Sequence, residues 1–411
     1  MAHRPTAAVP SDLKLSNRMQ VLEVFKWGGQ HTINQAARQI GLSRQTVMKA
    51  VQFFVDKGIL TIVGKGNSTS SGGKRPDLFA LTGQKYLLCI DLWPDQLNFT
   101  LLDFQCHTID RLHLPQPLPD DLQRTVQMVG AAVPGLLSHN QVTKEMLCGV
   151  CISTSGIVNY HTNALRYNSN SPGWGTDVPL ADSLRPFFSP DTLIVVENIA
   201  KLTARSLLKQ TELQTLRVLS VFTAWGLSGC FIDRGHIMNG KDSLIGEFGH
   251  MILAPDDDER CGCGCYGCFE RLVSNSRLRR RAAVLLRQDP DSILNSFVLS
   301  ELTIHSVFTA SRRGDRCARQ LADETARLFA MAVRNITLAF DPDVVVFQGD
   351  YADADDYFLQ RFQSYLQEFQ YYPPGGPFRL QLDPRPLESL SLEGAYLLLM
   401  DRLFRDSSIY V

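Results

Sequence analysis

Four cysteines lie within eight residues of this chain, and they constrain its local fold more than any other feature. They are Cys261, Cys263, Cys265 and Cys268, in the run CGCGCYGC. In a reducing compartment such a cluster indicates a metal site before it indicates a disulfide. Thiolates and a neutral imidazole suit tetrahedral zinc, so we expect His250, from the run GEFGHM, to complete a set with Cys261, Cys263 and Cys268.

This ligand set predicts a structural Zn²⁺ ion. Four protein ligands leave no coordination position open for water, which argues against a catalytic metal. Cys265 is a fifth candidate ligand. The alternative is a loop of free thiols in which His250 only serves the core.

Length and composition set the broad class. A chain of 411 residues is expected to form two or three domains. Its 44% hydrophobic and 20% charged residues are typical of a soluble globular protein. No stretch is apolar enough to cross a membrane, and residues 1–10 lack the apolar core of a secretory signal. We therefore expect a cytoplasmic protein with no membrane partner.

The net charge of −1 conceals a basic head and an acidic body. Residues 1–85 hold 12 Lys or Arg and 4 Asp or Glu, a balance of +8. Subtracting these from the totals of 41 and 42 leaves 29 against 38, a balance of −9. This division indicates that the head binds a polyanion while the body has another task.

The head has the pattern of a helix-turn-helix. Apolar residues recur at helical spacing in 16–28, 32–41 and 43–54, and each segment is bounded by a glycine or by a Ser or Thr cap. The third segment buries a stripe that comprises Val47, Ala50, Val51 and Phe54. In such a motif the second helix of the pair presents its first residues to base edges in the major groove.

Several side chains of the head are candidates for DNA contact. Arginine reaches guanine and glutamine reaches adenine, so Arg44 and Gln45 are predicted to read sequence. Thr46 and Lys49 could equally contact phosphate. Two β-prone runs, 59–63 and 78–81, predict a hairpin wing with a basic tip, whose phosphate-contacting residues would be Lys65, Lys74 and Arg75.

The alternative for the head is an interaction module or linker with a solvated basic face. The capped turn, the wing and the local charge together favour double-stranded DNA. Winged modules usually act as dimers on paired half-sites, so we expect the body to supply the dimer contact.

The body alternates strands with helices, which predicts an α/β protein. The expected strands are 86–93, 97–104, 146–153, 192–198, 217–225 and 343–349, and the clearest helices are 200–208 and 317–339.

Taken together, these motifs resemble the ROK family (repressors, open reading frames and kinases), particularly its glucose-type and xylose-type repressors. The segment 261–270 matches the signature C-x-C-G-x-x-G-C-x-E at every fixed position, and 247–250 matches E-x-G-H. The resemblance covers nearly the whole chain. It implies a winged helix-turn-helix domain at 1–83, then a two-lobed actin-like (ribonuclease H-like) sugar kinase fold with lobes at 84–198 and 199–411, the second carrying the zinc loop and the dimer surface.

The resemblance also assigns an effector site. Glu247, His250 and Glu270 match the family's ligands for sugar hydroxyls, and His250 would bind zinc as well. Carboxylates suit this role because they accept hydrogen bonds from vicinal hydroxyls. Ser155-Gly156 stands where the family has a Pro-Gly sugar loop, and Asn198 matches the Asn of its E-N-D-A segment.

The chain departs from the family at the residues that serve phosphoryl transfer. Ile199 replaces the Asp that acts as general base, and isoleucine cannot accept a proton. The phosphate loop D-x-G-G-T reads DLWPD here, so Trp93 and Pro94 replace two glycines whose amides could approach phosphate. We therefore expect no kinase activity.

The sequence thus predicts a DNA-binding regulator, a repressor of carbohydrate uptake or catabolism genes, that acts as a homodimer or tetramer on an operator. A small carbohydrate effector would bind the catalytically inactive body. Two alternatives remain open. One is an active sugar kinase with a DNA-binding head, and the other is a regulator controlled by a partner protein such as a phosphotransferase component.

Overall fold

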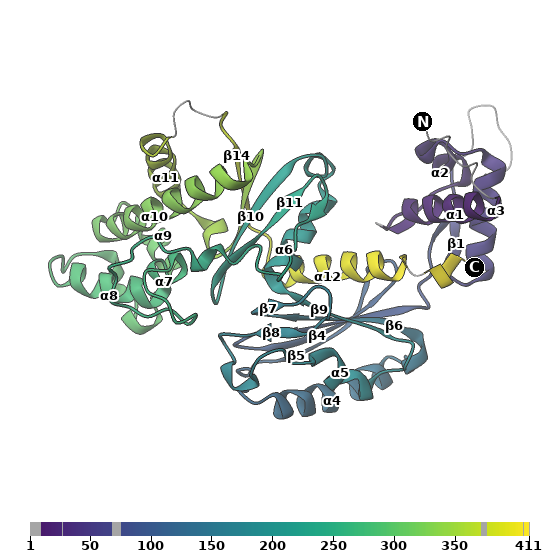
Figure 1. Ribbon diagram of the computed structural model, residues 1–411, viewed down its shortest axis with the longest axis horizontal. Coiled ribbons are helices and arrows are strands. Elements are labelled where there is room, and N and C mark those ends of the chain that lie inside the picture. Colours follow the sequence, from purple (N-terminus) through teal and green to yellow (C-terminus); the bar gives the residue numbers. More distant parts are fainter. Residues whose placement is uncertain (1–9, 27, 68–74, 371–375, 406, 411) are drawn as a thin grey trace, which may run out of the picture.

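The computed structural model describes residues 10–26, 28–67, 75–370, 376–405 and 407–410. Figure 1 shows a small N-terminal head and two larger lobes, the first at the bottom of the view and the second at the left. A long helix, α12 (Leu387–Leu403), runs from the region between the lobes towards the head. The predicted α/β class is confirmed.

Three helices form the head, and local sequence signals set their ends. They are α1 (Pro10–Lys26), α2 (Ile33–Ile40) and α3 (Arg44–Asp56). The Thr32 side chain caps α2, and Gly41 ends that helix in the left-handed conformation. Ser43 Oγ caps α3 by accepting a hydrogen bond of 3.1 Å from the Thr46 amide. The predicted second and third helices and the turn between them are confirmed.

A hairpin and a buried stripe complete the head. Strands β1 (Leu60–Lys65) and β2 (Asp77–Leu81) pair antiparallel, as predicted for the two β-prone runs. The expected stripe of α3 is fully buried, namely Val47, Ala50, Val51 and Phe54. Lys74 lies between the two strands in the sequence but outside the described residues.

The first lobe is a five-stranded sheet in the order β5-β4-β3-β6-β9. Its strands are β3 (Tyr86–Leu92), β4 (Leu97–Asp103), β5 (Thr108–Leu114), β6 (Leu147–Thr154) and β9 (Leu193–Asn198). Helices α4 (Leu122–His139) and α5 (Leu180–Leu184) cover one face, and α12 contacts β3 and β6 on the other (Figure 1). Because β3, β6 and β9 are parallel, their carboxyl ends meet at one edge, and a small hairpin of β7 (Ile157–Val158) and β8 (Leu165–Tyr167) follows β6 there.

The second lobe is also a five-stranded sheet, in the order β12-β11-β10-β13-β14. Its strands are β10 (Arg217–Thr223), β11 (Leu227–Asp233), β12 (His236–Ile237), β13 (Val344–Gly349) and β14 (Arg379–Asp383). Its helices are α7 (Phe269–Leu272), α8 (Asn275–Leu286), α9 (Ile304–Arg312), α10 (Arg316–Phe340) and α11 (Asp356–Glu368). Helix α10 supplies much of the buried core, including Phe329, which packs against rings from β13 and α11.

The C-terminal segment joins the first lobe to the head. Tyr396 of α12 donates a hydrogen bond of 2.9 Å to the Phe104 carbonyl in the first lobe. Lys26 of α1 forms an ion pair of 2.9 Å with Asp401. Beyond the helix, the Tyr410 ring packs edge-on against Phe54 of α3, with ring centroids 6.0 Å apart. Head, first lobe and C-terminal segment therefore share one continuous hydrophobic core.

The expected strands of the body are all present, and strands with weaker apolar signals were missed. Strand β5 alternates exposed and half-buried residues at a sheet edge, and β11 carries glycine and serine in its first half. Neither pattern distinguishes a strand from a loop without its neighbours. Among the described helices, none has the length and apolar character needed to span a bilayer.

Candidate functional site

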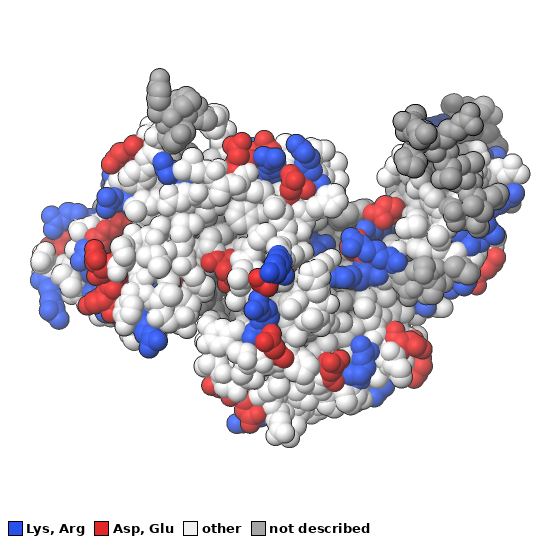
Figure 2. Space-filling model, viewed as in Figure 1, with Lys and Arg blue, Asp and Glu red and all other residues white. Residues whose placement is uncertain are grey.

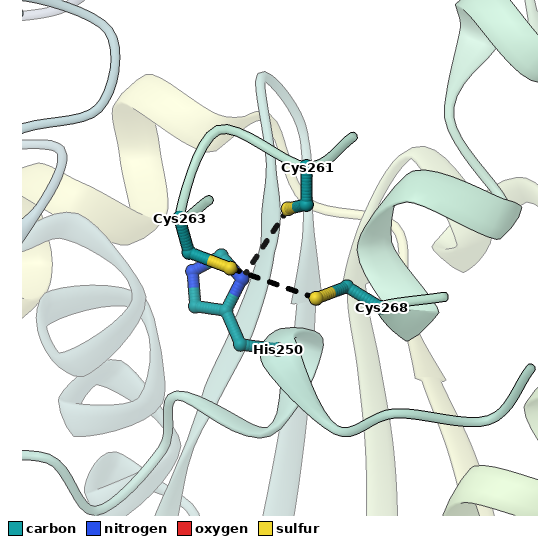
Figure 3. Close-up of side chains that lie close together, drawn as sticks. All are labelled: His250, Cys261, Cys263 and Cys268. Atoms are coloured by element: carbon teal, nitrogen blue, oxygen red, sulfur yellow. Dashed lines mark hydrogen bonds between the residues drawn. The ribbon is translucent and has the colours of Figure 1, made fainter. Parts of the chain in front are cut away.

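Three cysteines and one histidine converge at the edge of the second lobe (Figure 3). His250 ends a short 3-10 helix, Phe248–His250, and Cys268 immediately precedes α7. Cys261 and Cys263 lie on the loop between these two elements. Their four ligand atoms all lie within 4.8 Å of one another, so the predicted set comes together in space.

The spacing of these atoms fits a tetrahedral ion. Cys261 Sγ lies 3.6 Å from His250 Nδ1, and Cys263 Sγ lies 3.6 Å from Cys268 Sγ. A tetrahedron built with ordinary zinc bond lengths has S···S edges of ~3.8 Å and S···N edges of ~3.6 Å. The residues present therefore fit Zn²⁺. Cys265, the fifth candidate, is exposed and is not part of the group.

Glycine lets the loop close around the four ligand atoms. Gly267 has a φ of +67°, and a Cβ there would lie 1.8 Å from the Ala254 carbonyl oxygen. Gly249, next to His250, would place a Cβ 1.8 Å from the carbonyl oxygen of Leu227. Only glycine permits these backbone approaches, which bring the two ends of the loop together.

The two predicted sugar-binding carboxylates lie beside this cluster. Glu270 Oε2 accepts a hydrogen bond of 2.7 Å from the amide of Leu227. Burial raises the pKa of Glu247 and the neighbouring Glu270 raises it further, whereas His250 and Lys201 act to lower it. Glu247 immediately precedes the 3-10 helix that His250 ends, and a Cβ on Gly249 would lie 3.4 Å from Glu270 Cβ, so the three residues lie close together.

The first lobe contributes the other predicted effector residues. Asn198 Nδ2 donates a hydrogen bond of 2.6 Å to the Gly156 carbonyl, and Ser155 Oγ donates one of 3.1 Å to Asn168 Oδ1. Gly156 has a φ of +98°, and a Cβ there would lie 2.3 Å from the Tyr167 carbonyl. Asn198, Ser155 and Gly156 therefore lie together at the carboxyl edge of the first sheet.

Two further polar residues lie in this region and were not predicted from the sequence. Asn168 follows β8, and Lys201 lies in the first turn of α6 (Ile199–Ser206). Both are buried. The one available signal was a lysine within the otherwise apolar start of that helix.

The place of the expected phosphate loop is filled by aromatic and aliphatic side chains. Trp93, Ile199 and Phe222 form a buried cluster against which Trp225 and Leu387 pack. The rings of Trp93 and Trp225 come from different lobes, and their centroids lie 5.3 Å apart. We call this cluster the interlobe plug.

Asp91 is the first residue of the expected phosphate loop, and its side chain is hydrogen-bonded within the protein. It accepts a hydrogen bond of 2.9 Å from Ser391 of α12. Burial raises its pKa to about 7, although hydrogen bonds from Ser391 and Ser153 oppose the shift. The carboxyl group is thus directed at α12.

The predicted DNA-contacting residues mostly lie on the surface of the head. Arg44, Gln45 and Lys49 of α3 are exposed, as is Arg75. Thr46 is half-buried, and its hydroxyl oxygen lies 2.9 Å from Ser43 Oγ. Lys65 is exposed and forms an ion pair with Asp77 across the hairpin.

Comparison with known proteins identifies the family. The model of the ROK family matches residues 87–401. The chain belongs to the ROK family. Among its ROK relatives is the DNA-binding transcriptional dual regulator NagC of Escherichia coli K12, which is 24% identical over 335 residues, 80% of this chain and 79% of the relative.

Solved ROK structures share the fold. A ROK family transcriptional regulator, described as a homologue of the E. coli MLC protein, has a TM-score of 0.79 and 17% identity, covering 97% of this chain and 99% of its own. A ROK family glucokinase from Streptomyces griseus, solved with glucose and AMPPNP, has a TM-score of 0.62 and 22% identity, covering 76% and 98%. The ROK regulator therefore matches the fold of the head as well as that of the two lobes.

Proposed function

We infer that this protein is a sugar-responsive, DNA-binding transcriptional regulator. The observation that carries this proposal is the exposed face of α3, where Arg44, Gln45 and Lys49 stand at the start of a capped helix that follows a tight turn. The regulators among its relatives support it. We expect a repressor of carbohydrate genes that acts from the cytoplasm.

In this proposal the head is a winged helix-turn-helix. Helix α3 enters the major groove, with Arg44 and Gln45 at base edges and Thr46 and Lys49 at the backbone. The hairpin of β1 and β2 is the wing, and Lys65, Lys74 and Arg75 contact phosphate. Figure 2 shows acidic and basic side chains interspersed over the visible face of the lobes.

The body is the sensor. Glu247, His250 and Glu270 from the second lobe would bind the effector together with Ser155, Gly156 and Asn198 from the first. Zn²⁺ held by His250 and three cysteines would fix the loop that carries these groups, in a structural and not a catalytic role. A partner protein that docks on the zinc-bearing region is the remaining alternative for the signal.

We propose that the DNA-binding domain spans 1–83, the first lobe 84–198 and the second lobe 199–411. Helix α12 belongs to the last range but packs on the sheet of the first lobe. A change in the angle between the lobes would reach the head through α12, since Ser391 of that helix bonds Asp91 of β3 and Tyr410 packs on α3. In a homodimer or tetramer this would alter the spacing of the heads. Ligand can drive such a change only as far as it favours one state.

Operator binding provides the direct test. Fluorescence anisotropy on duplexes from upstream of the protein's own gene and of neighbouring sugar genes is expected to show selective binding that weakens with salt. Arg44→Ala should weaken binding to the preferred duplex by about tenfold to hundredfold, because a bidentate base contact is lost. Arg287→Ala, which removes an exposed arginine at the end of α8, is the matched control and should bind normally. Equal binding to every duplex would contradict the proposal.

The absence of kinase activity is a second expectation. With Ile199 at the position of the base and Trp93 in the phosphate loop, ADP release from Mg-ATP should stay at background with any hexose or pentose. A coupled ADP assay on wild type and Glu247→Ala measures this. Sugar-dependent ADP release that disappears in Glu247→Ala would instead establish an active kinase.

A further inference from the structure

A cavity lies where the head, the first lobe and the C-terminal segment meet, and we call it the junction cavity. Its volume is about 290 Å³, close to the lower end of the range of about 300–1,000 Å³ that is usual for ligand sites. None of the residues that line it belongs to the predicted effector site. Its size suits a molecule of one ring or one short branched chain. Its apolar walls comprise Ile59, Phe104, Leu147, Leu403, Phe404 and Ile409.

Hydrogen bonds tie the walls of the junction cavity to one another. The Phe104 amide donates a hydrogen bond of 3.1 Å to the Lys85 carbonyl, and the Phe104 carbonyl accepts the bond from Tyr396 of α12. On another side of the cavity, Thr192 Oγ1 donates a hydrogen bond of 2.9 Å to the Leu147 carbonyl. These bonds oppose collapse of the walls into the space between them, so the cavity is a built feature of the junction.

One half-buried cation, Lys85, lines this cavity. Its Nζ lies 3.9 Å from Cys148 Sγ, and it forms no salt bridge with any described carboxylate. Burial raises the pKa of the Cys148 thiol, although Lys85 opposes the shift, so the lysine faces a neutral thiol, which is a weak acceptor. Glu145 and Asp191 also line the cavity, but both are exposed, and water can solvate them. The group that lacks a strong partner is therefore the ammonium of Lys85.

We propose that the junction cavity is a second effector site, which binds a small carboxylic acid with an aromatic or branched aliphatic body. The carboxylate would bond Lys85, and the body would contact the apolar walls. Ile59 lines the cavity from the head and Ile409 from the C-terminal segment, so a bound ligand would favour one position of the head over others. The effect on operator binding rests on the proposed function, whereas the binding of the acid does not.

Calorimetric titration of the full-length protein tests the proposal with matched probes. The acids are phenylacetate and 3-methylbutanoate, and the comparison compounds are phenylacetamide, 3-methylbutanamide and phenethylamine. At least one acid should bind about tenfold or more tighter than its own amide, because a hydrogen bond between two charged groups is worth more than one with a neutral acceptor. Equal or tighter binding of an amide or of the amine overturns the proposal, as does a panel with no binder.

Variants assign the binding to this cavity. Lys85→Met should remove the preference for the acid over its amide and leave the Tm near the wild-type value, since the side chain is only half-buried. Leu403→Trp should fill the cavity and abolish binding of both compounds. Lys144→Met, which removes an exposed lysine of the 3-10 helix Lys144–Met146, is the control and should keep the full preference. An unchanged preference in Lys85→Met would show that the acid binds elsewhere.

Operator binding with and without a saturating acid tests the coupling to the head. The Kd for the preferred duplex should change by about fivefold or more in wild type and stay constant in Lys85→Met. An unchanged Kd in wild type that binds the acid would overturn the role as an effector site. The two proposals fail in different ways, because a protein that binds no duplex selectively can still bind the acid, and selective DNA binding can persist without any acid bound.

Discussion

Cys268→Ser is expected to abolish the proposed zinc binding and to unfold the loop between His250 and α7. Cys268 is fully buried, and its sulfur lies 3.6 Å from Cys263 Sγ. A structural zinc site contributes an apparent ~10–16 kcal/mol in small zinc domains, so losing a ligand should reduce metal affinity by orders of magnitude. Because Phe269 and Leu272 of α7 are buried beside the site, the Tm of the second lobe should fall as well. Metal analysis of the purified variant and a thermal melt measure both effects.

Cys265→Ser is the matched control for this prediction. It makes the same chemical change three residues away, at an exposed cysteine outside the four-ligand group. We expect one zinc per chain and a wild-type Tm. If Cys268→Ser kept its zinc, or if both variants lost it, the assignment of His250, Cys261, Cys263 and Cys268 would be wrong. Treatment with a strong chelator should reproduce the Cys268→Ser phenotype in wild type.

Trp93→Ala should cost about 3–5 kcal/mol of unfolding free energy, the usual range for truncating a buried large aromatic residue. Trp93 is 1% exposed and packs against Trp225 of the other lobe. Its Nε1 donates a hydrogen bond of 3.3 Å to Ser153. The substitution removes the centre of the interlobe plug, so the angle between the lobes should also become less restricted. Urea unfolding measures the first effect, and small-angle X-ray scattering measures the second as a larger radius of gyration.

Trp174→Ala separates the plug from ordinary core packing. Trp174 is buried within the first lobe alone, where its Nε1 bonds the Pro119 carbonyl at 2.9 Å. The loss of stability should be comparable, yet the scattering curve of the folded protein should not change. Identical scattering from the two variants would show that the plug does not hold the lobes. Looser lobes in Trp93→Ala should also weaken effector binding, since the proposed effector-binding residues come from both lobes.

Local signals in the sequence were sufficient for helices α2 and α3 of the head and for the grouping of one histidine and three cysteines. Thr32, Gly41 and Ser43 act within a few residues of their own position, so caps and apolar spacing predicted α2 and α3 correctly. The four metal ligands lie within 19 positions of one another, and their chemistry restricts what they can do. The family motifs likewise identified Glu247 and Glu270, which the structure brings together.

Contacts between distant segments were decided only by the tertiary structure. Trp93 and Trp225 come from separate lobes, and their meeting depends on how two sheets are oriented, which no local pattern encodes. The return of α12 to the first lobe and the contact of Tyr410 with Phe54 likewise join residues hundreds of positions apart. The burial of Lys201 also becomes visible only once the chain has folded, as does the Asn168 amide nitrogen, which has no hydrogen-bond partner among the described residues. Burial and hydrogen-bond satisfaction depend on every neighbour in space.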